Sequence, residues 1–181
     1  MRRVALLLAV GLPLAGCGGG AASAPKLPAT KVAMTLTSAA FSAGGPIPAR
    51  FTCDGAGTSP PLDWSGVPPR ARELALVVED PDAQRFLHWT VLGLLPTTTA
   101  LPAGRVPSGV AQPRNGFGDP GWGGPCPPEG DDPHHYVFSL YALDAPLGLH
   151  AGASPDTVGR AIAEHAIARG VLVGTYARRG G

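Results

Sequence analysis

The sequence has little charge and none of the motifs that mark the common enzyme classes. Only 15% of its residues are Asp, Glu, Lys or Arg, and only 6% are aromatic. It has no basic run interleaved with aromatic residues, so nucleic-acid binding is not indicated. It also has no H-E-x-x-H, H-x-x-E-H or C-x-x-C spacing for zinc, no G-x-S-x-G turn and no P-loop. These absences disfavour catalysis by the corresponding routes.

What is present indicates one domain rich in loops. The 181 residues are 44% hydrophobic, which is enough for a sizeable core. Gly and Pro number 26 and 21, so short strands and turns are favoured over long helices. Lys and Arg number 14 and Asp and Glu 13; losing Arg2 and Arg3 with a leader would leave a formal charge of −1. No internal repeat is visible, and the charge indicates no particular partner.

The first 16 residues are predicted to be a lipoprotein signal peptide. Two arginines precede an apolar stretch (4–14) that is shorter than the roughly 20 residues of a membrane-spanning helix. The tetrapeptide Leu14-Ala15-Gly16-Cys17 resembles a bacterial lipobox, so Cys17 would become the lipidated N-terminus. An ordinary secretory leader with a chance cysteine is the alternative. The expected location is extracytoplasmic, in the cell envelope or periplasm, anchored by lipid to a bacterial membrane.

Residues 17–30 are predicted to form the lipidated cysteine and a flexible tether, and 31–181 the folded domain. The tether is rich in Gly, Ala and Pro and has no amphipathic face to bury. Beyond Cys17 the chain has two cysteines, Cys53 and Cys126, in a compartment that is expected to be oxidising. A disulfide between them and a pair of free thiols both remain open.

The pattern of apolar residues predicts a mainly β protein. Six strands are expected, at 32–37, 47–52, 73–79, 86–95, 136–143 and 171–176. One late helix is expected, with Ser154 as its N-cap, Pro155 at its first position and Gly170 at its end. The segment 59–64 looks like a loop. Since the strands do not alternate with helices, the fold class is an antiparallel β-sandwich with one late α-helix.

Two segments could build a polar site. Asp80 and Asp82 follow an apolar strand, and residues two apart in an extended chain point to the same side. His88 comes six residues after Asp82, so a tight turn could bring it back to the carboxylates. A turn with solvated acids is the alternative.

The second segment is the glycine- and proline-rich run 121–128, followed by His134, His135 and Tyr136. Glycine amides can surround an anion, although many structural loops are equally rich in glycine. A zinc site built from the histidines and aspartates lacks any standard spacing. A nucleophilic Cys126 lacks a following helix N-terminus to lower its pKa.

These segments resemble the phosphatidylethanolamine-binding protein family, in its bacterial Raf kinase inhibitor-like branch. The resemblance spans Val32 to Arg178 and rests on Asp80-Pro81-Asp82-Ala83, His88-Trp89, Gly123-Gly124-Pro125-Cys126-Pro127-Pro128 and His134-His135-Tyr136. It implies a large antiparallel sheet packed on a smaller one, with a shallow pocket for phosphate, acetate, cacodylate or phosphoethanolamine-like groups. The implied ligand-binding residues are Asp80, Asp82, His88, Gly124, Pro125, Cys126, His134 and Tyr136.

The chain also departs from the family pattern. Gln84 stands where a proline is usual, and the turn to His88 is shorter than usual. The segment 112–118 differs from the family's Gln-Gly-x-Asn-Asp-Phe-Gly, and no C-terminal helix follows the last strand, so kinase inhibition is not carried over.

The resulting hypothesis is a membrane-tethered, non-enzymatic binding protein for a small anionic or phosphorylated ligand. It is expected to need no cofactor and no metal and to bind no nucleic acid. The alternative is an inhibitor of a protease or kinase that docks at the pocket rim. A metal-assisted hydrolase that uses the Asp and His cluster is a third, weaker hypothesis.

Overall fold

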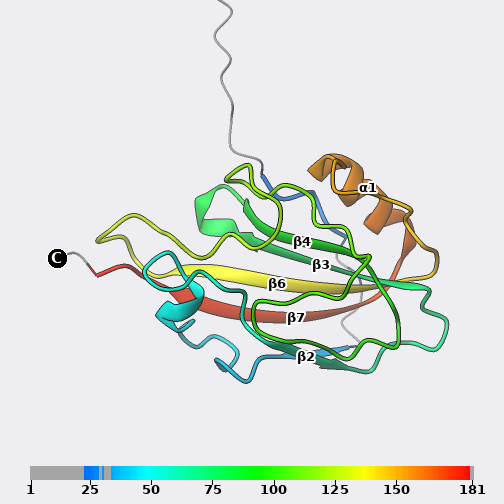
Figure 1. Cartoon of the computed structure of the whole chain (residues 1–181), viewed down its shortest axis with the longest axis horizontal. Coiled ribbons are helices and arrows are strands. Elements are labelled where there is room, and N and C mark those ends of the chain that lie inside the picture. Colours follow the sequence, from blue (N-terminus) through cyan, green and yellow to red (C-terminus); the bar gives the residue numbers. More distant parts are fainter. Residues whose placement is uncertain (1–22, 29, 31–33, 180–181) are drawn as a thin grey trace, which may run out of the picture.

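The protein folds as two antiparallel sheets with one α-helix. The computed structural model describes residues 23–28, 30 and 34–179 (Figure 1). Within these residues one sheet has the order β4-β3-β6-β7 and the other the order β1-β2-β5. The elements are β1 (Thr35–Thr37), η1 (Ala49–Phe51), β2 (Leu62–Ser65), β3 (Glu73–Asp80), η2 (Pro81–Ala83), β4 (Phe86–Leu94), β5 (Ala100–Leu101), β6 (His134–Leu143), α1 (Pro155–His165) and β7 (Ala166–Tyr176). The predicted sandwich, with a larger sheet on a smaller one and a late helix, is confirmed.

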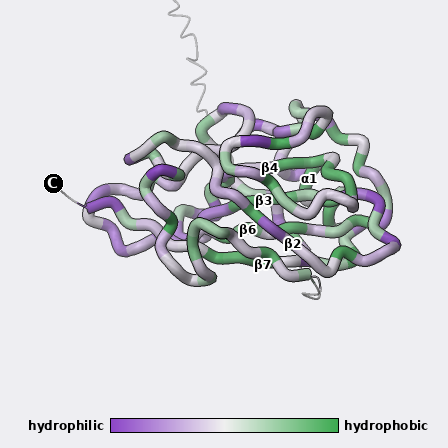
Figure 2. Tube along the Cα trace, turned by 60° about the horizontal axis from the view of Figure 1, so that its bottom comes forward, coloured by the Kyte–Doolittle hydropathy of each residue, from purple (hydrophilic) through white to green (hydrophobic). Residues whose placement is uncertain are grey.

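The larger sheet is buried on both faces. Along β3, Leu74, Leu76 and Val78 contribute to the core between the two sheets, whereas Ala75 and Val77 contribute to a second core beneath α1. This arrangement explains why the sequence of β3 is continuously apolar rather than alternating. Figure 2 shows the same distribution, with hydrophobic residues along the strands and hydrophilic residues at the two ends of the sandwich.

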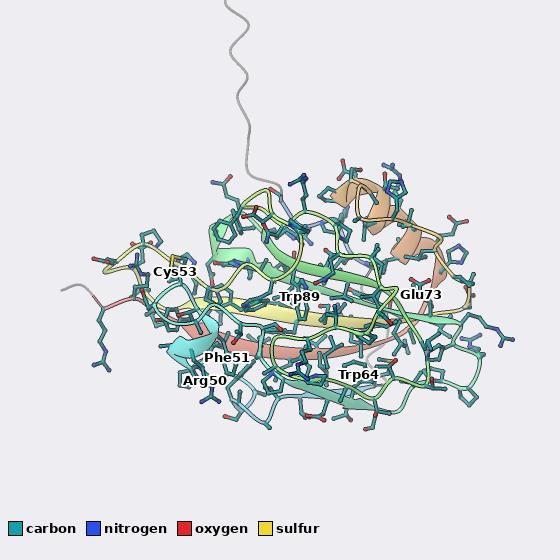
Figure 3. The ribbon with its side chains drawn as sticks, in the orientation of Figure 1. Arg50, Phe51, Cys53, Trp64, Glu73 and Trp89 are labelled. Carbon is teal, nitrogen blue, oxygen red and sulfur yellow. A yellow bond between two sulfur atoms is a disulfide. The ribbon has the colours of Figure 1, made fainter. Side chains whose placement is uncertain are left out.

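Buried polar atoms tie the loops to the sheets. The carboxylate of Glu73 accepts hydrogen bonds from the backbone of Gly93 (3.0 Å) and of Leu147 (2.9 Å). The indole of Trp64 donates to the carbonyl of Thr98, and that of Trp89 to the side chain of Gln112. Glu73, Trp64 and Trp89 are labelled in Figure 3. These partners satisfy groups whose burial would otherwise be costly.

The helix begins as expected and ends earlier. Ser154 is the N-cap and accepts from the backbone N–H of Thr157 (3.2 Å), with Pro155 at the first position. The helix ends at His165 rather than near Gly170, because the following residues pair with β6 and open β7. Strand pairing and the burial of Ala168 outweigh the helical spacing of the sequence. None of the helices among the described residues is long and apolar enough to span a bilayer.

The prediction of a strand at 47–52 is wrong. Pro48 precedes a single 3-10 turn, in which the backbone N–H of Phe51 donates to the carbonyl of Pro48 (2.9 Å). The turn places Phe51 in the core, and burial of this one ring explains the irregular backbone. In contrast, the segment expected to be a loop at 59–64 ends in the short strand β2, which pairs with β1 and β5.

Residues 23–28 are packed on the domain, although they were expected to belong to a free tether. We call this segment the strap. Ser23 forms an antiparallel bridge with Phe86 at the start of β4. Ala24 is 9% exposed and joins the second core with Leu27. The folded structure therefore starts before residue 31. Residues 1–22, with the predicted leader and Cys17, lie outside the described residues.

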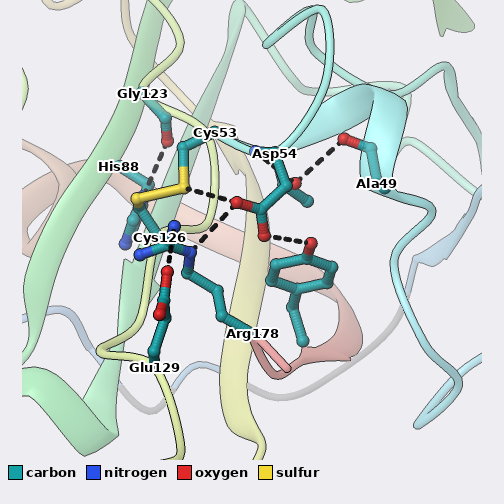
Figure 4. The surroundings of a disulfide bond; sticks show 10 residues. Ala49, Cys53, Asp54, His88, Gly123, Cys126, Glu129 and Arg178 are labelled. Carbon is teal, nitrogen blue, oxygen red and sulfur yellow. Dashed lines mark hydrogen bonds and ion pairs between the residues drawn. A yellow bond between two sulfur atoms is a disulfide. The ribbon is translucent and has the colours of Figure 1, made fainter. Parts of the chain in front are cut away.

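Cys53 and Cys126 form a disulfide, which settles the alternative left open by the sequence. The bridge joins residues that are 73 positions apart and ties the loop after η1 to the glycine- and proline-rich run (Figure 4). The backbone N–H of Cys53 also donates to the carbonyl of Pro125 (3.1 Å). Two long loops are thereby held together at one end of the sandwich.

Replacing both Cys53 and Cys126 with serine is expected to lower the free energy of unfolding by up to about 4 kcal/mol, because the cross-link restricts the unfolded chain. Denaturant unfolding measures this loss. A reductant should destabilise the native chain and leave the double variant unchanged. Equal stability of the two oxidised proteins would contradict the prediction.

A chain that starts at residue 30 is expected to be less stable than one that starts at residue 23, by about 2 kcal/mol, because the apolar contacts of the strap are lost. Thermal and denaturant unfolding of the two chains provide the comparison. The chain from residue 23 should match the non-lipidated full-length protein. If both truncations were equally stable, the strap would contribute nothing to the fold.

Candidate functional site

A small cavity of about 100 Å³ lies where β3 ends and β4 and β6 begin. Three strands and two loops contribute to its wall, so its shape depends on the sheet register. The lining residues are Asp80, Ala83, Phe86, His88, Phe117, Cys126, Pro127, Pro128, His134 and Tyr136. Five of the eight residues predicted for a ligand site are among them.

Asp80 organises this corner of the fold. It is buried at the end of β3 and caps η2, accepting at Oδ1 from the backbone N–H groups of Asp82 (2.9 Å) and Ala83 (3.1 Å). Its Oδ2 accepts from Nδ1 of His134 at 2.7 Å. Both oxygens of Asp80 are therefore committed to the protein, and the carboxylate orients His134 rather than a ligand.

The turn from η2 into β4 explains one departure from the family pattern. Gln84 and Arg85 both have positive φ, at 54° and 60°. Proline is confined to φ near −65°, so it could not occupy position 84 in this turn. The left-handed pair reverses the chain within two residues and returns His88 to the side of Asp80.

His88 is almost fully buried on β4, at 3% exposure. Its Nδ1 lies 2.7 Å from the carbonyl of Gly123, which can only accept, so Nδ1 carries the proton. The backbone N–H of Gly123 donates in return to the carbonyl of His88. Burial lowers the pKa of His88 below its usual value. The neutral ring then has a hydrogen-bond acceptor at Nε2.

The ring of His88 lies among aromatic side chains. The ring centroids of Phe86 and Tyr136 are 5.0 and 5.1 Å from it, and that of Phe117 is 5.9 Å away. Phe117 is 53% exposed and packs edge-on against Phe86 at 4.7 Å. The mouth of the cavity is therefore apolar, and this surrounding supplies the burial that shifts the pKa of His88.

Tyr136 has an unpaired polar atom in this wall. The residue is fully buried, and its hydroxyl has no hydrogen-bond partner among the residues that the structure describes. Burial, and next the nearby carboxylate of Asp80, raises its pKa well above the usual value, so the phenol stays protonated. A buried donor without a partner costs about 1–3 kcal/mol. Such a hydroxyl can donate a hydrogen bond to a water molecule or to a ligand oxygen.

Three predicted ligand-binding residues do not line the cavity. Asp82 lies on the surface, where the backbone N–H (2.7 Å) and the Nδ1 (2.9 Å) of His135 contact its carboxylate and lower its pKa. η2 rotates Asp82 away from Asp80, so the extended-chain argument failed. Gly124 packs on η1, where an added Cβ would lie 2.9 Å from the carbonyl of Phe51. Pro125 holds Cys53 through its carbonyl.

Five lining residues were not predicted, namely Ala83, Phe86, Phe117, Pro127 and Pro128. Pro127 and Pro128 belong to the proline-rich run that was noted, and Phe86 opens a predicted strand. Phe117 had a weaker signal, as an aromatic residue inside a glycine-rich loop. Its position depends on the backbone N–H of Gly116, which donates to the carbonyl of Leu87 across the sheet edge (2.7 Å).

A larger cavity of about 600 Å³ lies on the other side of the disulfide. Three of its four charged groups, all except Arg179, bind one another. Asp54 accepts from the hydroxyl of Tyr176 (2.7 Å) and from Arg178 (3.0 Å). Arg178 also contacts Glu129 at 3.0 Å (Figure 4). The Tyr176 hydroxyl, more than Arg178, lowers the pKa of Asp54. Because these partners are already paired, the smaller cavity is the stronger candidate.

Metal ligands were a further possibility raised by the sequence. Across the described part of the chain, no group of three or more His, Cys, Asp or Glu side chains is arranged to hold a metal ion. Asp80 pairs with His134 and Asp82 with His135 instead.

The comparison with known sequences covers most of the chain. The family model described as phosphatidylethanolamine-binding protein matches residues 37–177. A protein of Methanothermobacter thermautotrophicus, named only as a UPF0098 protein, is 45% identical over 152 residues, covering 80% of this chain and 99% of its own length. A Mycobacterium tuberculosis relative, LppC, described as a candidate lipoprotein, is 41% identical over 186 residues, covering 93% of this chain and 92% of its own.

Solved structures agree with this assignment. A phosphatidylethanolamine-binding protein homologue of Chlamydia trachomatis, CT736, is 42% identical with a TM-score of 0.74, covering 80% of this chain and 97% of its own. Escherichia coli YbcL, described as a member of the mammalian PEBP family, is 34% identical with a TM-score of 0.76, covering 81% and 99%. From its fold and its sequence, the chain belongs to the phosphatidylethanolamine-binding protein family.

Proposed function

We propose that this protein is a lipid-anchored, extracytoplasmic binding protein whose cavity holds one small anionic group, a phosphate or a carboxylate. The observation that carries the proposal is the buried hydroxyl of Tyr136, which lines the cavity and lacks a partner among the described residues. A ligand oxygen would supply that partner. The hydrogen bond would be charge-assisted and therefore stronger than one to a neutral group.

The size of the cavity supports a small group. About 100 Å³ corresponds to roughly three water molecules, at about 30 Å³ each. A single oxyanion fits this volume, whereas the remainder of a larger ligand would have to extend past Phe86 and Phe117. The cavity would thus select one headgroup and leave the rest of the molecule outside.

The polar groups offer a donor and an acceptor to the same ligand. Tyr136 donates from its hydroxyl, and neutral His88 accepts at Nε2. A monoprotonated phosphate has both unprotonated oxygens and an O–H group, so it complements the pair. His134 is less available to a ligand, since Asp80 holds its Nδ1 at 2.7 Å and the carboxylate of Asp131 lies 3.8 Å from its Nε2. We expect weak binding, because the carboxylate of Asp80 is also close.

The proposal is a binding role without catalysis. Cys126, the cysteine among the lining residues, is bonded to Cys53 and has no free thiol. Tyr136 keeps its proton, and Nδ1 of His88 is occupied by Gly123. An activated nucleophile with an oriented base is therefore not assembled from these lining residues. The lipid anchor is supported by the lipobox at Cys17 and by the description of LppC.

Tyr136→Phe is expected to weaken the binding of phosphate or O-phosphoethanolamine about tenfold or more, because it removes one hydrogen bond to a charged ligand. NMR titration of the domain from residue 23, followed at the Gly123 amide, measures this loss. Tyr176→Phe is the matched control, since it removes a hydroxyl outside the cavity, and it should bind like the native domain. Unchanged affinity in Tyr136→Phe would refute the proposed donor.

The ring of His88 is expected to titrate below about pH 6.5 in the free protein, since burial lowers its pKa. The unfolded chain then binds this proton more readily, so stability is full above about pH 6.5 and falls as the pH decreases below it. His88→Gln should remove this component of the pH dependence. Phosphate should raise the midpoint of His88, because an anion stabilises the protonated ring. A midpoint above 6.5 without ligand would contradict this account.

A further inference from the structure

The strap meets the fold at the rim of the cavity. Ser23 pairs with Phe86, a lining residue. The backbone N–H of Ala24 donates to the carbonyl of Arg85 (2.6 Å), and Arg85 donates from its guanidinium to the carbonyl of Pro25 (2.8 Å). Figure 1 shows this first described segment, in blue, between β4 and α1. The chain that leads toward Cys17 therefore departs from the cavity rim.

The strap is fixed along its length. A Cβ on Gly159 of α1 would lie 2.5 Å from Cβ of Pro25, so the helix and the strap pack closely. Further on, the hydroxyl of Tyr141 donates to the carbonyl of Pro28 (3.4 Å). With Ala24 buried as well, the point of departure at Ser23 has a set position relative to the sheet.

The distance to the predicted anchor is short. Ser23 lies six positions after Cys17 in the sequence, and a chain spans at most about 3.5 Å per residue, so the reach is no more than about 21 Å. By comparison, the nine residues of β4 extend about 26 Å from Phe86 to Leu94. An anchor at Cys17 therefore keeps the Phe86 end of β4 near the bilayer and allows the Leu94 end to lie farther away.

The exposed apolar residues distinguish the two ends of β4. Phe117 (53% exposed) packs on Phe86 at the cavity mouth, and Leu95 (67% exposed) follows Leu94 at the opposite end. An exposed aromatic ring beside a lipid anchor can enter the interfacial region of a bilayer. Leu95 has no anchor near its end of the strand.

We propose that the cavity rim, formed by Phe86, Phe117 and the start of the strap, faces and contacts the surface of the bilayer in which Cys17 is anchored. This inference rests on the lipid anchor of the proposed function. The cavity then opens toward the membrane–water interface, and its ligands approach from there. Exposed charges in the neighbouring segments have both signs, with Lys26 and Arg114 against Asp119, so the contact depends on the anchor rather than on charged lipid.

The test uses the lipidated full-length protein in phosphatidylcholine vesicles. Phe117→Cys and Leu95→Cys each introduce a single free thiol, because the native Cys53 and Cys126 are bonded and Cys17 carries the lipid. A fluorophore on that thiol is quenched by phospholipids spin-labelled at the headgroup. Quenching should be several-fold stronger at position 117 than at position 95.

A second variant tests whether the short connection between Cys17 and the strap causes the difference in quenching. Inserting about 20 Gly and Ser residues between Cys17 and Ser23 lengthens the flexible reach by about 25 Å and keeps every contact of the strap. Quenching at position 117 should then fall toward the value at position 95. Equal quenching at the two positions in the native chain, or no effect of the insertion, would overturn the inference.

The lipid anchor and the ligand-binding cavity are tested by separate experiments. If the protein did not float with the vesicles, the anchor and this orientation would both be overturned. The phosphate titration of the domain from residue 23 would be unaffected, since it tests the cavity without a membrane.

Discussion

The antiparallel pairing of β3 with β6 determines where every polar group of the candidate site lies. The register runs from Glu73 opposite Leu143 to Glu79 opposite Val137. It places Asp80, at the end of β3, beside His134 and Tyr136, at the start of β6. Because both strands are buried on both faces, a register shift of one residue would move apolar side chains out of two cores. The geometry of the site is therefore protected by the packing of the whole sheet.

The carboxylate of the site and its hydrogen-bond donors have different roles. Asp80 uses one oxygen to cap η2 and the other to hold His134, so it shapes the wall without offering a free charge. His88 is held by Gly123 from the opposite side. Among the fully buried side-chain polar atoms of the described residues that line the cavity, the hydroxyl of Tyr136 is the one without a partner. The wall is thus rigid, and its unsatisfied group is the one that a ligand can complete.

The sequence predicts an element correctly where its local residue pattern agrees with the environment of that segment in the fold. The apolar runs of β3 and β6 and the capping residues at Ser154 predict their elements correctly. His88, His134 and Tyr136, which the surrounding motifs indicate as ligand-binding residues, line the cavity. Asp82 was misplaced because a 3-10 turn, rather than an extended chain, follows β3. Phe117 was missed because its role comes from a contact with Phe86, 31 positions earlier in the chain, which no local pattern encodes.

Two errors share a physical cause. The sequence predicts that the helix continues to Gly170 and that residues 23–28 belong to a flexible tether, because the first segment has helical spacing and the second has no amphipathic face. In the fold, Ala168 pairs with Ala142 on β6, and Ala24 enters the core beneath α1. Long-range strand pairing and burial therefore determine the conformation of both segments. Such tertiary contacts routinely outweigh the weak preferences of small residues.

The most direct test of the binding account is a crystal structure of the domain from residue 23 grown with phosphate and without other oxyanions. The account predicts a phosphate in the small cavity, with one oxygen within hydrogen-bond distance of the Tyr136 hydroxyl and another near Nε2 of His88. A cavity that holds only water under saturating phosphate, with the Tyr136 hydroxyl bonded to a protein group, would contradict it.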